Sequence, residues 1–221
     1  MIKKLMLGMM LLSTSLVSQA GLITPVITGA DMAGITVTVN YNTSTPSETD
    51  VWSVLSTTLG TSGNAVIDQE GLSGGVSGTD WSLTQQGDSL GNSDGKGTFY
   101  GAWDFVGDLS MISSIVIDTG DTGILFDSLY MYPLVDTNGS GQGKEFTSFN
   151  PTVVADTAAT YSNNVFEELY TTLTIDVAAQ GKGFSFWADT DKATVPEPAT
   201  MFTFALGLVA LTSLRKKSSG K

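Results

Sequence analysis

The chain has 221 residues, a formal net charge of −12, and neither cysteine nor histidine. Disulfide scaffolds, thiolate metal sites, His-based catalytic triads and His-ligated zinc sites are therefore excluded. Segment 21–195 holds four lysines and 21 acidic residues, a net charge of −17, and this excludes nucleic-acid binding because phosphates repel such a surface.

The first residues have the pattern of a secretory signal peptide. Lys3 and Lys4 precede an apolar run over 5–17, and residues 18–20 (Ser-Gln-Ala) offer small side chains at the positions that signal peptidase reads. We predict a signal peptide over 1–20, cut between Ala20 and Gly21, with signal peptidase as a partner.

Residues 21–194 form the expected passenger domain, which is long enough to bury one core. In segment 34–41 bulky side chains alternate with polar ones, as in a half-buried antiparallel strand. Further short runs of this kind lie at 51–58, 98–106, 111–118, 123–132, 165–177 and 183–188. Clusters rich in Gly, Asn, Asp and Ser separate them, among them 71–78, which we predict to be a mobile loop. The prediction is an all-β antiparallel sandwich, with the jelly roll as one candidate topology.

Asp118-Thr-Gly follows a hydrophobic strand and resembles the catalytic turn of aspartic proteases. Those enzymes need two such carboxylates sharing a proton across one substrate. The second Asp-Thr-Gly begins at Asp121, in the same turn, and cannot supply that symmetry. We predict a hairpin turn between strands 111–118 and 123–132 instead.

Glycoside hydrolysis by two carboxylates is a further alternative. Glu167 and Glu168 are adjacent and would point to opposite faces of a strand, while Asp104 and Asp108 form another candidate pair. A solvated acidic face explains these residues better, so we expect no catalytic residues and no enzymatic activity.

A calcium loop is the candidate metal site. Asp136, Asn138 and Ser140 place side-chain oxygens at alternate positions before a glycine, and Glu145 can close the loop. The match is partial because Thr147 stands where a bidentate glutamate is required. We therefore expect no obligatory cofactor, with Ca²⁺ as the candidate ligand. Other carboxylates that can form a second site are Asp118, Asp121 and Asp127.

The four tryptophans allow two interpretations. Trp52, Trp81, Trp103 and Trp187 can stack on sugar rings if they are exposed. In a β-sandwich tryptophan is more often part of the core, and we predict burial for each.

The C-terminal segment 195–221 has the features of a membrane anchor. Pro196 and Pro198 hold the Glu197 peptide extended, and the run 199–214 carries no charge. A helix over these sixteen residues rises about 24 Å, which makes a short transmembrane helix that snorkelling side chains can extend. The basic stop-transfer cluster is Arg215, Lys216 and Lys217. Positive charge at both ends of the chain places the segment between them outside the inner membrane.

The order of these elements, Pro-Glu-Pro, apolar helix and basic end, resembles the PEP-CTERM sorting tail of Gram-negative bacteria over residues 195–217. The resemblance implies recognition by an exosortase, a membrane-embedded transpeptidase-like enzyme, and processing near residues 196–198. It implies transfer to the envelope or the exopolysaccharide matrix, and nothing about the activity of the passenger.

From these observations we expect an exported protein that is anchored transiently in the inner membrane and then moved to the cell surface or extracellular matrix. Its expected role is structural or adhesive, with exopolysaccharide as a candidate partner. The alternative is a calcium-dependent carbohydrate-binding module of the matrix.

Overall fold

The computed structural model describes residues 23–24, 27–93, 98–128, 144–166 and 169–193. They are built from two main antiparallel sheets and very little helix, which confirms the predicted all-β fold class. In this part of the chain no helix is long and apolar enough to cross a membrane. The signal peptide, the sorting tail and the transmembrane helix predicted over 199–214 lie outside the described residues.

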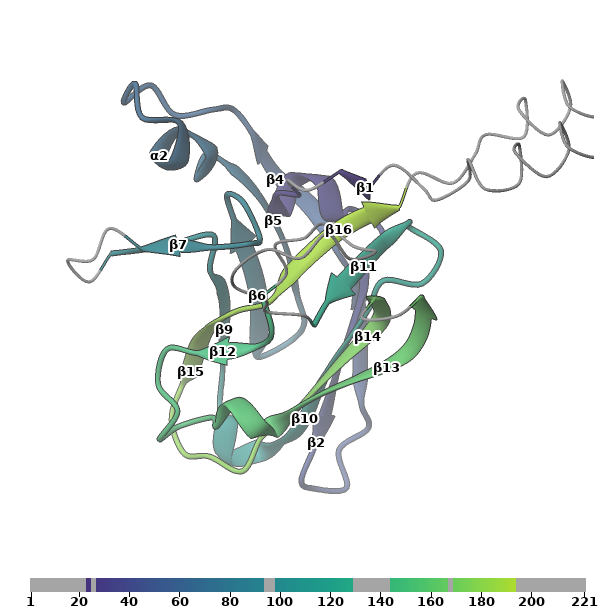
Figure 1. Ribbon diagram of the computed structural model, residues 1–221. Helices are drawn as coiled ribbons and strands as arrows, with labels where there is room; N and C mark the ends of the chain where they lie inside the picture. The colour runs from purple at the N-terminus through teal and green to yellow at the C-terminus, as the bar shows by residue number, and fades with distance from the viewer. Residues whose placement is uncertain (1–22, 25–26, 94–97, 129–143, 167–168, 194–221) are drawn as a thin grey trace, which may run out of the picture. The chain divides into compact units, whose positions relative to one another are not determined.

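The first sheet has eight strands in the order β1-β16-β11-β14-β10-β2-β3, and β13 pairs with β14 as well. Its strands are β1 (Ile23–Thr24), β2 (Thr36–Tyr41), β3 (Glu48–Val51), β10 (Ile112–Asp118), β11 (Ile124–Asp127), β13 (Ala159–Phe166), β14 (Leu169–Asp176) and β16 (Asp189–Ala193). In Figure 1, β13 lies along β14, and β11 lies beside β16.

The second sheet has six strands in the order β12-β15-β9-β6-β5-β4. Its strands are β4 (Ser53–Thr57), β5 (Leu72–Ser77), β6 (Trp81–Gln86), β9 (Trp103–Gly107), β12 (Thr147–Ser148) and β15 (Gly183–Trp187). A small two-stranded sheet pairs β7 (Asn92–Ser93) with β8 (Phe99–Tyr100). The described helical segments are η1 (Gly29–Met32), α2 (Ala65–Gln69), η2 (Leu109–Met111) and η3 (Asp156–Ala158).

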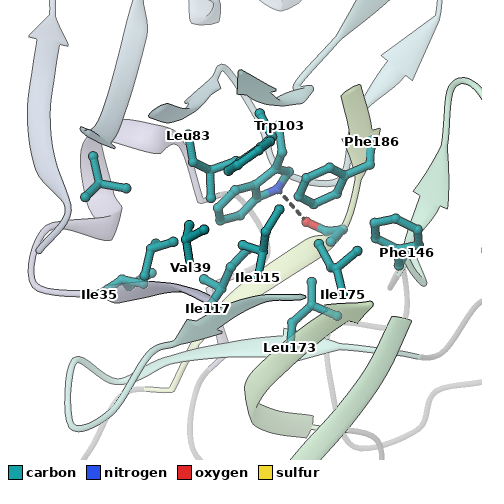
Figure 2. Close-up of a cluster of buried hydrophobic side chains, with 14 of the residues drawn as sticks. Ile35, Val39, Leu83, Trp103, Ile115, Ile117, Phe146, Leu173, Ile175 and Phe186 are labelled. Atoms are coloured by element: carbon teal, nitrogen blue, oxygen red, sulfur yellow. Dashed lines mark hydrogen bonds between the residues drawn. The ribbon is translucent and has the colours of Figure 1, made fainter. Parts of the chain in front are cut away.

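The hydrophobic core is built from alternating residues of both sheets (Figure 2). The first sheet contributes aliphatic side chains, among them Val37, Val39, Ile115, Ile117, Leu173 and Ile175. The second contributes mainly aromatic ones, among them Trp81, Trp103, Phe105, Phe184 and Phe186. Period-two alternation in the sequence thus becomes one buried face on each sheet.

The tryptophan prediction is confirmed for three of the four residues. Trp52, Trp81 and Trp103 are at most 4% exposed, whereas Trp187 is half-buried. Trp103 lies at the centre of the core, with its ring 5.3 Å from that of Trp52 and 5.9 Å from that of Phe186.

The loop predicted over 71–78 is wrong, because residues 72–77 form strand β5 between β6 and β4. Glycine is needed here for close packing rather than for a turn. A Cβ at Gly74 would lie 1.9 Å from the Gly29 carbonyl oxygen and 2.2 Å from Trp52 Nε1. A Gly-Gly pair inside a strand marks this close approach of backbone and ring.

The hairpin predicted between strands 111–118 and 123–132 is also wrong. Strands β10 and β11 do not pair with each other; both pair with β14, at residues 172–176 and 169–170. Segment 119–123 is therefore a loop between two strands that follow one another along β14. Residues 129–132 of the predicted second strand lie outside the described residues.

Candidate metal centre

Three aspartates meet where β11 pairs with β16. Asp127 and Asp189 are directly opposite in the antiparallel register, and Asp191 lies two residues beyond Asp189 on the same face of the strand. One carboxylate oxygen of each residue lies within 4.8 Å of the other two. All three are at most 1% exposed. Ordinary β-pairing thus brings together carboxylates that are 62 and 64 residues apart in the sequence.

The loop at Ser89 fixes one side of this aspartate cluster. Ser89 Oγ lies 3.1 Å from Asp189 Oδ1, to which it can donate, and it accepts a 3.1 Å hydrogen bond from the Thr190 backbone N–H. The Ser89 backbone N–H donates to the Ile27 carbonyl at 2.8 Å. Asp189 Oδ1 is therefore held, while Asp189 Oδ2 has no hydrogen-bond partner in the described part of the chain.

The electrostatics of the cluster disfavour full ionisation. Burial raises the pKa of Asp189 well above its ordinary value, and the neighbouring charges of Asp191 and Asp127 raise it further. Burial also raises the pKa of Asp88, in the turn beside Ser89. A positive charge nearby would favour the ionised form of Asp189 at this buried point.

Lys144 is a described lysine that interacts electrostatically with Asp189. Its backbone carbonyl accepts a 3.0 Å hydrogen bond from the Asp189 N–H. Its ammonium group lies 3.8 Å from the centroid of the Trp187 ring, a cation–π contact, and burial lowers its pKa. The lysine influences Asp189 electrostatically without forming an ion pair with it among the described contacts.

The donor set defines the chemistry that this centre can support. Three carboxylates offer only oxygen ligands, which suit hard cations such as Ca²⁺ and Mg²⁺. What the geometry supports is binding of a divalent cation.

The predicted calcium loop is not described by this structure. Asp136, Asn138 and Ser140 lie outside the described residues, and the side chain of Glu145 is exposed. Of the second group of carboxylates, only Asp127 belongs to the aspartate cluster. Asp121 is exposed, and Asp118 Oδ1 caps its own loop by accepting from the Gly120 N–H at 2.9 Å.

Two residues of the cluster were missed by sequence reasoning. Asp189-Thr-Asp191 follows a predicted strand, and its spacing places both carboxylates on one face of an extended chain. That spacing is a usable signal. The pairing with Asp127 is not visible in the sequence, because no local rule sets which strands become neighbours.

The alternative carboxylate pair for glycoside hydrolysis is not assembled. Asp104 lies in β9, and Asp108 follows the end of that strand. Four residues of extended backbone separate their Cα atoms by about 13 Å, whereas the carboxyl groups of catalytic pairs lie about 5–9.5 Å apart. Asp104 accepts a hydrogen bond from Ser185, and Asp108 forms an ion pair with Lys182. Glu167 and Glu168 lie outside the described residues.

The ion pair gives a testable titration. The hydrogen bonds from Lys182 and Ser110 lower the pKa of Asp108 to about 2. The contribution of ionised Asp108 to the stability of the fold should therefore be complete above its ordinary pKa near 4 and be lost as the pH falls through about 2. We expect Lys182→Gln to raise the pKa of Asp108 toward its ordinary value in an NMR titration. A value unchanged by the substitution would contradict the assignment.

Comparison with protein-family models finds the PEP-CTERM protein-sorting motif at residues 194–217. Comparisons with curated proteins and with solved structures find no match. The motif implies recognition by an exosortase, export, and transient anchoring in the membrane. It includes the predicted sorting residues Pro196, Glu197 and Pro198 and the basic cluster Arg215, Lys216 and Lys217. The resemblance expected from the sequence is confirmed, and the chain carries a PEP-CTERM sorting domain.

Proposed function

We propose that the sandwich is a structural or adhesive component of the cell surface or exopolysaccharide matrix, delivered by signal peptidase and an exosortase. The sorting motif at residues 194–217 supports this proposal, because it indicates an extracellular protein that is sorted by an exosortase. The sorting tail determines where the protein is delivered, and the passenger domain functions at that place.

The packing of the tryptophans favours a structural body over a sugar-binding one. Each indole N–H donates to a protein oxygen: Trp52 to Gly29, Trp81 to Glu48, Trp103 to Ala188 and Trp187 to Tyr100, at 2.8–3.0 Å. The three buried tryptophans, Trp52, Trp81 and Trp103, therefore stabilise the core and have no open face for a ligand.

The most exposed aromatic group among the described residues contains Phe99, Phe149 and Trp187, with ring centroids 4.4–5.3 Å apart. Lys144 lies over the Trp187 ring, and a Cβ at Gly91 would come within 2.3 Å of it. The ring is therefore enclosed and offers little area for stacking on a sugar. This arrangement argues against the calcium-dependent carbohydrate-binding alternative.

The acidic surface supports a matrix role in a different way. The body carries a net charge of −17 over residues 21–195. Such a charge keeps the protein soluble and attracts divalent cations, which can bridge it to anionic polysaccharides. We therefore propose that the domain contacts the matrix through many weak ionic interactions and has no catalytic site.

Substitution of the two tail prolines tests the sorting step. In a host that carries an exosortase, we expect Pro196→Ala/Pro198→Ala to block processing, because the extended, helix-breaking segment before the apolar run is lost. The protein should remain in the membrane fraction with residues 199–221 attached, as read by terminal-peptide mass spectrometry. Pro46→Ala/Pro151→Ala, which changes two exposed prolines of the body, is the matched control and should be processed normally.

Processing of the tail-proline variant at the wild-type rate would refute the assignment of the sorting element. Glycan-array binding by the released body, with and without a chelator, addresses the passenger. Saturable binding that a chelator abolishes would replace the structural proposal with the carbohydrate-binding alternative.

A further inference from the structure

We propose that Asp127, Asp189 and Asp191 bind one calcium ion, which joins β11 to β16 and stabilises the folded body. Its ligands are not those of the calcium loop predicted at residues 136–145, and the inference does not depend on the matrix role proposed above. It follows from the position, burial and charge of the three side chains.

The three carboxylates lie close enough together to contact one ion. Cross-strand neighbours in an antiparallel pair have Cβ atoms about 4.5–5.5 Å apart, so Asp127 and Asp189 approach each other directly. Two like charges at that separation are unfavourable in a sheet. The third carboxylate, from Asp191, brings one oxygen within 4.8 Å of the other two. Oxygens at this separation can contact one ion at the 2.3–2.6 Å distances typical of calcium.

The hydrogen bonding of Asp189 provides a second, independent observation. This side chain is 1% exposed, so water does not solvate it, yet its Oδ2 has no hydrogen-bond partner in the described part of the chain. A buried carboxylate oxygen without a partner costs free energy unless a ligand satisfies it. Because Ser89 holds Oδ1, the orientation of Oδ2 is fixed for such a ligand.

Three acidic side chains at one buried point also favour a bound cation on grounds of charge. Among the described residues, Lys182 pairs with Asp108, Lys192 is exposed, and Lys144 lies against Trp187. Of these lysines, Lys144 influences Asp189 electrostatically. A divalent ion neutralises two of the three charges and contacts all three groups.

Calcium fits better than magnesium on chemical grounds. Calcium accepts irregular coordination by six to eight oxygens, including bidentate carboxylates, whereas magnesium demands a near-ideal octahedron and keeps several waters. A cross-strand aspartate pair with a third carboxylate two residues along is an irregular set, and its three residues are almost completely buried. Extracellular modules bind calcium with dissociation constants of about 10⁻⁴–10⁻³ M, so the site would fill after export.

The position of the site gives the ion a mechanical role. Strand β16 ends at Ala193, immediately before the sorting motif, and it pairs with both β1 and β11. An ion bound across β11 and β16 therefore fastens the last strand of the body at the point from which the tail continues.

Thermal unfolding of the full-length chain in mild detergent tests the proposal. At pH 7.5, calcium at a hundredfold excess over its dissociation constant should raise Tm above the value in chelator by about 5–10 °C, and magnesium at the same concentration should raise it less. Asp189→Asn keeps the shape of the side chain and removes one charge. We expect this variant to lose the calcium-dependent shift, and to bind one calcium fewer per chain than the wild type in equilibrium dialysis.

Two comparisons keep the test decisive. Asp121→Asn removes an exposed carboxylate outside the cluster and should respond to calcium as the wild type does. In chelator, Asp189→Asn should be at least as stable as the wild type, because repulsion with Asp127 and Asp191 is relieved; this shows that the variant folds. An unchanged wild-type Tm, a stronger effect of magnesium, or a full calcium response in Asp189→Asn would each overturn the assignment.

Discussion

Replacing Trp103 with alanine should lower the free energy of unfolding by about 3–5 kcal/mol. The side chain is fully buried and lies beside the ring of Phe186 in β15 (Figure 2). It also packs against the rings of Phe126 in β11 and of Trp52. Its Nε1–H also donates to the Ala188 carbonyl at 3.0 Å, one residue before the aspartate cluster. Truncation leaves a large cavity and an unsatisfied carbonyl. Urea unfolding of the full-length chain, followed by far-ultraviolet circular dichroism, measures the loss.

Two companion variants separate the causes of this loss. Trp103→Phe retains most of the ring and removes the donor, and should cost about 1–3 kcal/mol for the carbonyl left without its partner, in addition to a packing change. Val106→Ala changes an outward-facing side chain on the same strand that is 57% exposed, and should stay within about 0.5 kcal/mol of the wild type. If Trp103→Ala were no more costly than Val106→Ala, the described core would be incorrect.

Gly74→Ala should be as damaging as the loss of a large core side chain, although it adds only one methyl group. The new Cβ would fall 1.9 Å from the Gly29 carbonyl oxygen and 2.2 Å from Trp52 Nε1, so backbone and ring must separate. That movement breaks the 2.9 Å hydrogen bond from Trp52 to Gly29. We expect destabilisation above about 3 kcal/mol, the range of severe overpacking, measured as a fall in the urea midpoint.

The matched control for this variant is Gly120→Ala. Gly120 has a positive φ of 50°, but a Cβ there would meet no atom within 4 Å. Its cost should therefore be limited to the left-handed backbone, about 1–2 kcal/mol. An equal cost for both substitutions would show that the close approach of η1 and Trp52 does not explain the glycine at position 74.

Strands with strict alternation could be predicted from sequence. Residues 34–41 became β2 because their bulky side chains recur at every second position and bury on one face. In β10 the same alternation holds for Ile115 and Ile117, beyond a β-bulge near Ile112. Strand β5 could not be predicted in this way. Its Gly-Gly pair has the composition of a turn, and only the approach of Trp52 and Gly29, distant in sequence, explains why glycine is needed there.

Local patterns likewise predict one functional element and miss the other. The sorting tail is a contiguous motif, so its elements can be recognised in order from the sequence alone. The aspartate cluster depends on the pairing of β11 with β16, a long-range contact that no local pattern specifies. The sequence analysis grouped Asp127 with Asp118 and Asp121, because only carboxylates close together in the sequence could be considered. Its partners in the structure are Asp189 and Asp191.

We propose that the sorting tail, together with the predicted signal peptide, delivers this domain beyond the inner membrane. The most direct test of this proposal is intact-mass measurement of the protein recovered from the cell surface and medium of an exosortase-bearing host. We expect a species that begins at Gly21 and lacks residues 199–221. Recovery of the chain from the cytosol, with both Met1 and Lys221 retained, would contradict it.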